Sequence, residues 1–183
     1  MRVIAGEAKG MRLKSPSGLN IRPTADRVKE ALFSIIGPDL IDAVFVDLYA
    51  GSGAIGIEAI SRGAERSIFV DNNKNSISLI RENLAITKLE NRGRVICADI
   101  KKAIKQLEDN GFKADIVFLD PPYNIVDLQS IIKLILNSSI LKGNGLVIVE
   151  HDRKNTGWTG NLTVSKQKKY GDTNLSFFLK YKG

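Results

Sequence analysis

Apolar runs of five or six residues alternate with longer amphipathic segments through the middle of the chain. The runs are rich in β-branched and aromatic residues and predict strands at 43–48, 66–71, 93–97, 114–119 and 145–149. The segments between them carry apolar residues at helical spacing and predict helices near 54–62, 73–87, 100–110 and 127–139. Strands separated by helices of this length form right-handed βαβ units. The pattern therefore predicts an α/β, Rossmann-like domain built on a mostly parallel sheet.

The first residues predict a small extension before that domain. Two short alternating runs around a Gly-flanked connection indicate a β-hairpin that carries Arg2, Lys9, Arg12 and Lys14. A helix follows, with Thr24 as its N-cap and Gly37-Pro38 as its end. The start and polar side of this helix carry Arg22, Arg27 and Lys29. We therefore expect an N-terminal hairpin and helix, packed on the core, at 1–37 and the Rossmann-like domain at 38–183.

The tail predicts two further strands, Leu162 to Ser165 and Leu175 to Tyr181, around a turn at Gly171-Asp172. We expect them to join the sheet as antiparallel additions, which gives seven strands with an antiparallel C-terminal strand. His151, the single histidine, is expected in a loop at a strand end. Trp158 and Tyr170 lie in basic, polar segments, where they could stack on RNA bases or cover the edge of the core.

The composition is that of an ordinary globular protein, with 43% hydrophobic and 26% charged residues among 183. No apolar run has the length of a membrane-spanning helix, and the N-terminus lacks a signal-peptide core, so we expect a cytoplasmic protein without a membrane partner. Cys97 is the only cysteine, which excludes an internal disulfide and a cysteine-rich metal site. It lies in an apolar strand and is expected to be a small core residue.

The net charge of +7 belongs to the two ends of the chain. Residues 1–30 hold seven Lys and Arg against three Asp and Glu, and residues 151–183 hold seven against two, whereas residues 31–150 are net negative. Basic ends around an acidic middle are typical of a polyanion-binding surface added to a catalytic domain. A solvated basic face that only aids solubility is the alternative.

A glycine turn follows the first strand of the central domain. Gly51, Gly53 and Gly56 would let backbone N–H groups approach a ligand at a helix N-terminus. With Asp71 20 residues after Gly51, this spacing fits a dinucleotide site. Asp47 argues against that, because its carboxylate would lie beside a pyrophosphate and repel it. The acidic strand end favours S-adenosylmethionine, whose ammonium and sulfonium are positive, over NAD; a purely structural turn is the third alternative.

Carboxylates follow four successive strands of the predicted sheet. Since the carboxyl ends of parallel strands face one crevice, we expect these side chains to share it: Asp47, Asp71, Asp99 and Asp120. In this interpretation Asp47 attracts the ammonium of the methyl donor, Asp71 accepts both ribose hydroxyls, and Asp99 accepts from the adenine amino group. For any one of them, capping of the next helix is an alternative role.

The most specific motif is Asp120-Pro121-Pro122-Tyr123, directly after a predicted strand. Two prolines stiffen the backbone and remove two donors, so the turn presents unsatisfied carbonyl oxygens. An NH2 group can donate one hydrogen to the Asp120 carboxylate and the other to the Pro121 carbonyl, which frees the nitrogen lone pair for attack on a methyl group. Tyr123 can stack on the attached ring. A merely rigid turn is the alternative.

These motifs resemble the class I S-adenosylmethionine-dependent methyltransferases that act on exocyclic or amide nitrogens. The segments R-V-I-A-G, G-M-R-L, R-P-T-A-D-R-V-K-E-A-L-F and Y-G-D-T resemble the RsmD family, over nearly the full length of the chain. The resemblance implies methylation of a guanine N2 amine in 16S ribosomal RNA, at guanine 966. It also implies that the segment from Arg22 to Arg27 folds over the donor site.

The predicted sites follow from these motifs and this resemblance. The target-amine site is Asp120, Pro121, Pro122 and Tyr123. The donor site comprises Asp47, Tyr49, Ala50, Gly51, Ser52, Gly53, Gly56, Asp71, Asn72, Asp99, Ile100, Arg22 and Thr24. The RNA-binding residues are Arg2, Lys9, Arg12, Lys14, Arg27, Lys168 and Lys169.

We expect a monomer that uses S-adenosylmethionine, releases S-adenosylhomocysteine and needs no metal. The expected partner is 16S ribosomal RNA or an assembly intermediate of the small subunit. A similar site could serve adenine N6 in DNA or a glutamine amide in protein, and a non-catalytic RNA-binding module is the remaining alternative.

Overall fold

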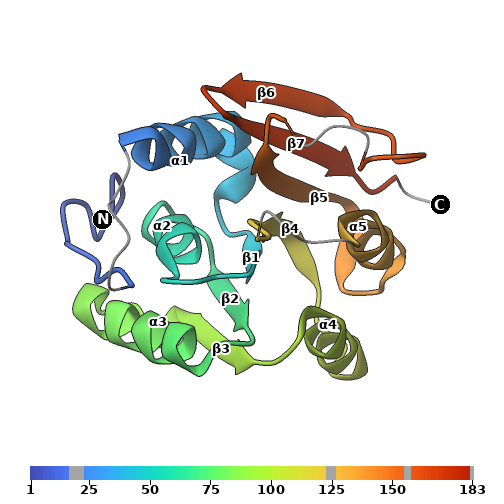
Figure 1. The fold of residues 1–183 in the computed structure, drawn as a ribbon. Coiled ribbons are helices and arrows are strands. Elements are labelled where there is room, and N and C mark those ends of the chain that lie inside the picture. Colours follow the sequence, from blue (N-terminus) through green and yellow to red (C-terminus); the bar gives the residue numbers. More distant parts are fainter. Residues whose placement is uncertain (17–22, 123–126, 155–157, 182–183) are drawn as a thin grey trace.

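A mixed sheet runs through the centre of the computed structural model (Figure 1). Within residues 1–16, 23–122, 127–154 and 158–181, which the structure describes, seven strands form it in the order β3-β2-β1-β4-β5-β7-β6. Strands β3 to β5 are parallel, and β7 is antiparallel to both β5 and β6. The expected Rossmann-like architecture, with an antiparallel C-terminal strand, is confirmed. The strands are β1 (Val44–Leu48), β2 (Arg66–Asp71), β3 (Gly93–Cys97), β4 (Ala114–Leu119), β5 (Leu141–Asp152), β6 (Lys166–Tyr170) and β7 (Thr173–Leu179).

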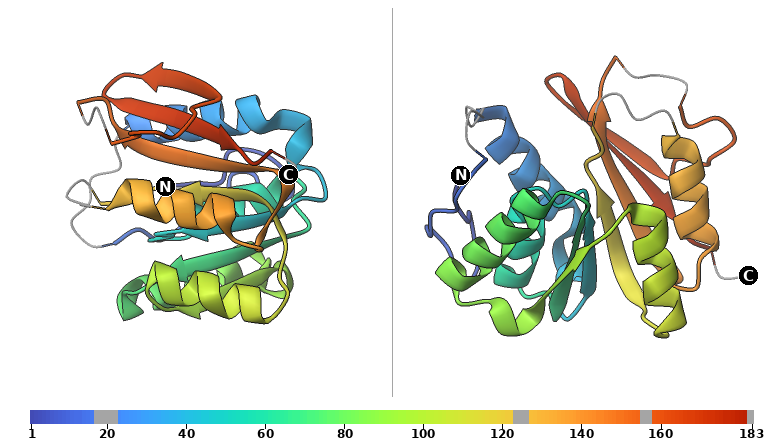
Figure 2. Two further views of the ribbon diagram at one scale, coloured as in Figure 1. Left: turned by 90° about the vertical axis from the view of Figure 1, so that its right-hand side faces the viewer. Right: turned by 60° about the horizontal axis from the view of Figure 1, so that its bottom comes forward.

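Helices cover both faces of this sheet, as the two views of Figure 2 show. One face packs against α1 (Pro23–Ile36), α2 (Ala54–Ser61) and α3 (Lys74–Thr87), and the other against α4 (Ile100–Asp109) and α5 (Leu128–Asn137). Short 3-10 helices lie at Gly37–Leu40 and Glu90–Arg92. Burial from both sides explains why the central strands are apolar along their whole length. None of the helices in the described ranges is long and apolar enough to cross a membrane.

Successive side chains of a strand point to opposite faces, and this alternation decides where the site can lie. Phe45 and Phe118 belong to the core beneath α1, whereas Val46 and Val117 belong to the core beneath α4 and α5. The central strands begin and end within one residue of the predicted ranges, because a short apolar run has clear borders. Strand β5 is longer than 145–149, since β7 pairs with it as far as Asp152.

The tail differs from its prediction at one strand. Residues 162–165 form no strand, and β6 begins at Lys166 instead, while the turn at Gly171 and the strand after it are present. Leu162 and Val164 lie in an irregular segment and pack on the core. The alternation of apolar and polar residues there reflects this packing and not a strand. Strand β6 is an exposed edge strand with three lysines, and charged edges of this kind discourage pairing with other chains.

The predicted N-terminal hairpin is present only as a single β-bridge. One antiparallel bridge joins Arg2 and Arg12, without a regular strand on either side. Helix α1 begins at Pro23, so the prediction of Thr24 as N-cap is wrong: Thr24 lies inside the helix, which starts with a proline as helices often do. The apolar side chains of the segment pack on α2 and α3, and they are Val3, Ala8 and Leu13. The division at residue 37 stays a prediction.

A buried ion pair fastens this segment to the domain. The Glu58 carboxylate is fully buried and accepts hydrogen bonds from the backbone N–H groups of Ile4 and Ala5, at 2.8 and 3.0 Å. The Nζ of Lys29 lies 3.1 Å from the same carboxylate and donates to the Arg2 carbonyl at 2.7 Å. The prediction of Lys29 on the polar side of the helix is therefore wrong, because this lysine is 3% exposed.

Cys97 is exposed, so the expectation of a core cysteine is wrong as well. The residue ends β3, which is the outer strand of the sheet on that side and is covered less completely than its neighbours. An apolar sequence context does not distinguish a central strand from an edge strand.

Glu58→Ala should lower the free energy of unfolding by about 3–5 kcal/mol, because it leaves the Lys29 ammonium buried without its partner. Urea denaturation measures this loss. Glu65→Ala is the matched control, since Glu65 pairs with Arg66 at the surface and its loss should change stability by less than about 0.5 kcal/mol. Equal effects of the two substitutions would contradict the anchoring role of Glu58.

Candidate functional site

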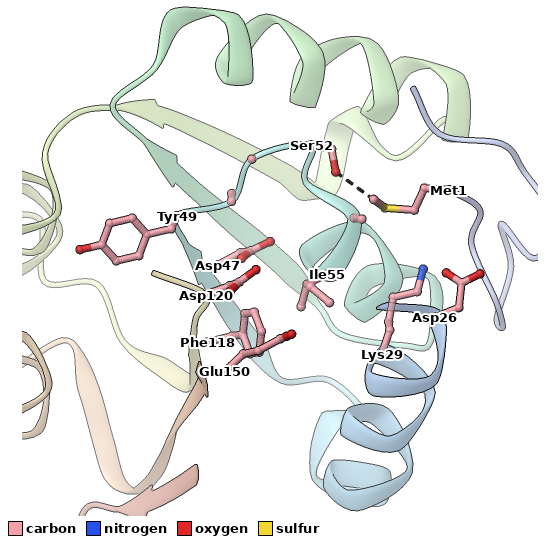
Figure 3. Close-up of a pocket in the computed structure, with 13 residues that line it drawn as sticks. Met1, Asp26, Lys29, Asp47, Tyr49, Ser52, Ile55, Phe118, Asp120 and Glu150 are labelled. Carbon is pink, nitrogen blue, oxygen red and sulfur yellow. Dashed lines mark hydrogen bonds between the residues drawn. The ribbon is translucent and has the colours of Figure 1, made fainter. Parts of the chain in front are cut away.

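A cavity of about 190 Å3 opens at the carboxyl ends of β1 and β4. The strand order reverses between these two strands, and ligands of open α/β sheets bind at such a switch point. Figure 3 shows its walls: the turn after β1, the N-terminal segment, α1, and the ends of β4 and β5. The lining residues are Met1, Asp26, Lys29, Asp47, Tyr49, Ala50, Gly51, Ser52, Ala54, Ile55, Phe118, Asp120 and Glu150.

The glycine turn forms one wall of the cavity. Tyr49 has a φ of 61° and Gly51 a φ of 55°, so the chain reverses sharply through left-handed backbone. A tyrosine is strained in this region, and such strain concentrates at functional sites. Gly56 does not reach the cavity: a Cβ there would lie 2.3 Å from the Phe69 ring, so this glycine lets α2 pack closely on β2.

Asp47 lies beneath the turn and is 2% exposed. Its carboxylate accepts a hydrogen bond from the Gly56 N–H at 2.9 Å, which ties the end of β1 to α2. Burial raises the pKa of Asp47 to about 7, with smaller upward contributions from Asp120 and Asp71, while the Gly56 hydrogen bond opposes the shift. A positive ligand in the cavity would favour the ionised form of this carboxyl.

Two further carboxyl groups face the same cavity from β4 and β5. Asp120 lines the cavity and has an exposed side, but the protein surrounding its carboxyl group raises its pKa to about 6. Burial and the neighbouring Asp120 raise the pKa of Glu150 to about 8. Figure 3 shows Asp47, Asp120 and Glu150 in a row, with Tyr49 turned away from them. Three carboxyl groups whose ionised forms are disfavoured therefore share the cavity, and a cation bound there would stabilise their ionised forms.

The other two predicted strand-end carboxylates bind backbone N–H groups. Asp71 accepts from Gly51 at 2.9 Å and from Asn73 at 2.8 Å, so it fixes the glycine turn from the next strand. Asp99 is the N-cap of α4 and accepts from Lys101 at 2.9 Å. Neither lines the cavity, but a carboxylate has about four acceptor positions, so both retain capacity for a ligand at the adjoining strand ends.

The remaining predicted donor-site and target-site residues divide between the cavity and its surroundings. Ala50, Gly51 and Ser52 line the cavity, whereas Gly53 is the N-cap of α2 and is not among the lining residues. Of the other positions, Asn72 is exposed, Ile100 is buried, Pro121 is buried and Pro122 is exposed. The predictions for Arg22 and Tyr123 lie outside the described residues.

Sequence reasoning missed several residues of the site, and Glu150 is the most informative of them. It follows an apolar run, as the four predicted aspartates do, so the same signal could have identified it. Met1 and Lys29 reach the cavity from segments that are distant in sequence, and no local pattern marks them. Asp26 also lines the cavity, and it belongs to the Arg22 to Arg27 segment that the family resemblance placed over the donor site.

His151 is a strand residue, not the expected loop residue. It is 8% exposed in β5 and its ring nitrogens contact the Ser176 hydroxyl at 2.9 Å and the Asp152 carbonyl at 3.0 Å. Its side chain points to the face opposite Glu150, where Trp158 packs edge-on against it and against Phe178. Trp158 therefore covers the edge of the core, which was one of its two predicted roles.

The predicted RNA-binding residues are all exposed: Arg2, Lys9, Arg12, Lys14, Arg27, Lys168 and Lys169. They belong to the N-terminal segment, α1 and β6, and Figure 1 shows α1 between the other two. Lys14 forms an ion pair with Glu82 at 2.7 Å. The N-terminal segment, α1 and β6 thus follow one another along one side of the molecule.

Comparisons with known proteins agree with this architecture. The family model described as "Conserved hypothetical protein 95" matches residues 1–179. The chain is 38% identical to the Bacillus subtilis protein YlbH, over 98% of this chain and 99% of that relative. It is 35% identical to ribosomal RNA small subunit methyltransferase D of Escherichia coli, over 85% of this chain and 76% of that relative. The solved structure of Escherichia coli yhhF has a TM-score of 0.83 and 31% identity, and covers 100% of this chain and 99% of that chain.

Asp47→Asn should stabilise the protein increasingly as pH rises. The unfolded chain loses this proton near pH 4 and the folded protein near pH 7, so the folded form binds more protons between these values and stability falls with rising pH. Asparagine keeps an acceptor for Gly56 without the charge, and its advantage should grow by about 2 kcal/mol from pH 5 to pH 8. Urea denaturation at both pH values tests this. Asp39→Asn, at an exposed position, should show no such growth.

Proposed function

The chain belongs to the RsmD family of methyltransferases, and we propose that it methylates the N2 amine of a guanine in 16S ribosomal RNA with S-adenosylmethionine. The observation that carries the proposal is the row of carboxyl groups at the switch point, beside the Asp120-Pro121-Pro122 corner. Methylation of guanine 966 in 16S RNA, as in the family, is the specific form of the proposal.

The donor-binding residues follow from charge. S-adenosylmethionine supplies a methyl group on a positively charged sulfonium. Asp47 and Asp120 would attract the sulfonium and ammonium groups, and the N–H groups of the glycine turn would bind the carboxylate of the donor. The cavity is smaller than the 300–1,000 Å3 usual for ligand pockets, so the adenosine half would extend along the strand ends toward Asp71 and Asp99.

The target amine would lie at the proline corner. Asp120 accepts one N2 hydrogen and the Pro121 carbonyl accepts the other, so the nitrogen lone pair points at the methyl group. When bound, the donor would supply the methyl group: the N–C bond would form as the C–S bond breaks, with the electrons of the C–S bond going to sulfur and S-adenosylhomocysteine as the product. The amine then loses a proton to the Asp120 carboxylate or to water. Positioning and electrostatics supply the acceleration.

The RNA would bind along the basic side formed by the N-terminal segment, α1 and β6. This surface carries the exposed basic residues Arg2, Arg27 and Lys168, among others, and it adjoins the cavity because Met1 of the N-terminal segment and Asp26 of α1 line the cavity. A phosphate backbone on this side would present an extruded base to the Asp120 corner. The substrate would be 16S RNA or an assembly intermediate of the small subunit, bound by a cytoplasmic monomer.

Asp120→Ala should reduce methyl transfer to RNA at least about 1,000-fold while the dissociation constant for S-adenosylmethionine changes by less than about threefold. Asp71→Ala should instead weaken donor binding about tenfold, because it lies on the donor side of the turn. Calorimetric titration and transfer of labelled methyl to RNA, DNA and protein separate these effects. Asp109→Ala, on an exposed turn of α4, is the control. Wild-type turnover by the Asp120 variant would refute the amine-binding role.

Binding of RNA should weaken steeply with salt, since each neutralised phosphate releases a counterion. Substituting Lys168 and Lys169 with alanine should lower the slope of log affinity against log salt by about 2, and filter binding between low and moderate salt measures it. Lys102 and Lys105, substituted together, are the control because α4 lies at the far end of the molecule from β6 (Figure 1). A flat salt dependence of the wild-type protein would contradict the RNA-binding surface.

A further inference from the structure

Glu150 and Asp120 occupy equivalent positions on neighbouring parallel strands. Leu119 and Val149 are register partners of β4 and β5, so the next residue on each strand is a carboxylic acid. Both continue the face that carries Phe118 on β4 and Ile148 on β5. Figure 3 shows the two side chains beside each other at the cavity, and Glu150 is unused by the steps described above.

Among the residues that the structure describes, the surroundings of Glu150 do not provide a cation for it. The other charged or titratable residues that line the cavity are Asp47 from β1, Tyr49 from the turn after β1, Asp120 after β4, and Asp26 and Lys29 from α1. Tyr49 is turned away from the carboxyl groups (Figure 3). The Lys29 ammonium already pairs with Glu58 and donates to the Arg2 carbonyl. On the other side, the β7 partner of Glu150 is the apolar Leu175.

Adjacent carboxyl groups in such a setting cannot all be ionised, and the one with the highest pKa retains a proton. Burial and the neighbouring Asp120 charge raise the pKa of Glu150 to about 8, above that of Asp120, so Glu150 is the neutral member near pH 7. A neutral carboxyl presents one O–H donor and one carbonyl acceptor side by side.

The guanine edge next to the N2 amine has the complementary pattern. Its N1–H is a donor and its O6 is an acceptor, and the two lie beside the amine that Asp120 would hold. We propose that Glu150 recognises the base by accepting a hydrogen bond from N1–H and donating one to O6, next to Asp120 on the N2 amine. Glu150 is then a specificity-determining residue of the target site, and this inference rests on the proposed guanine N2 activity.

The experiment compares Glu150→Gln and Glu150→Ala in methyl transfer to RNA. Glutamine has the same donor and acceptor pair as the neutral acid, so at pH 7 its kcat/KM should remain within about fivefold of wild type, whereas alanine should lose about 100-fold. Above pH 8 the wild-type rate should fall as Glu150 ionises and loses its donor, and the glutamine variant should lack this alkaline limb. Glu90→Gln, at an exposed position, is the control and should keep it.

A second substrate separates base recognition from a structural role. RNA with 2-aminopurine at the target position keeps the N2 amine but lacks both N1–H and O6. Wild-type enzyme should prefer guanine by about 100-fold, and Glu150→Ala should prefer it by less than about tenfold. An alanine variant with wild-type activity on guanine, an unchanged preference, or a persistent alkaline limb in Glu150→Gln would overturn the inference. Absence of N2-methylguanine from the wild-type reaction would instead refute the proposed function.

Discussion

The site depends on one constraint: several carboxyl groups are held close together at one edge of a parallel sheet. Asp47 lies near the end of β1, Asp120 follows β4 and Glu150 lies in β5, and the three share one face of the sheet. Pairing of these three adjacent strands therefore brings their carboxyl groups to one cavity. Their charges oppose one another, and burial makes ionisation costly. The fold keeps this arrangement at the expense of stability, as functional sites commonly do.

Two kinds of support hold the edge in place. The glycine turn is fixed from both neighbouring elements, because Asp71 binds the Gly51 N–H and Asp47 binds the Gly56 N–H. The Glu58 carboxylate of α2 accepts hydrogen bonds from the first residues of the chain and forms an ion pair with Lys29 of α1. The cavity wall thus combines segments that are distant in sequence and are joined by this buried ion pair and by the packing of Val3, Ala8 and Leu13 on α2 and α3.

The same carboxyl group can cap a helix and contribute to a ligand site. Asp99 caps α4, and Asp71 organises the glycine turn, yet both also mark the strand ends along which an adenosine would extend. The capping alternative and the ligand alternative are therefore not exclusive. Glu150 differs from Asp71 and Asp99, because its carboxyl group faces the cavity. The proposed base-recognition role would give this group hydrogen-bond partners on the substrate.

Local periodicity and the direction of parallel strands were enough to predict the central strands, the helices between them and the acidic residues at the strand ends. Which of these acids share a cavity, that Glu150 joins them and that Lys29 is buried depend on the folded chain. The exposure of Cys97 and the position of His151 in a strand depend on it as well. Burial and pairing of this kind depend on residues distant in sequence, so no local pattern contains them.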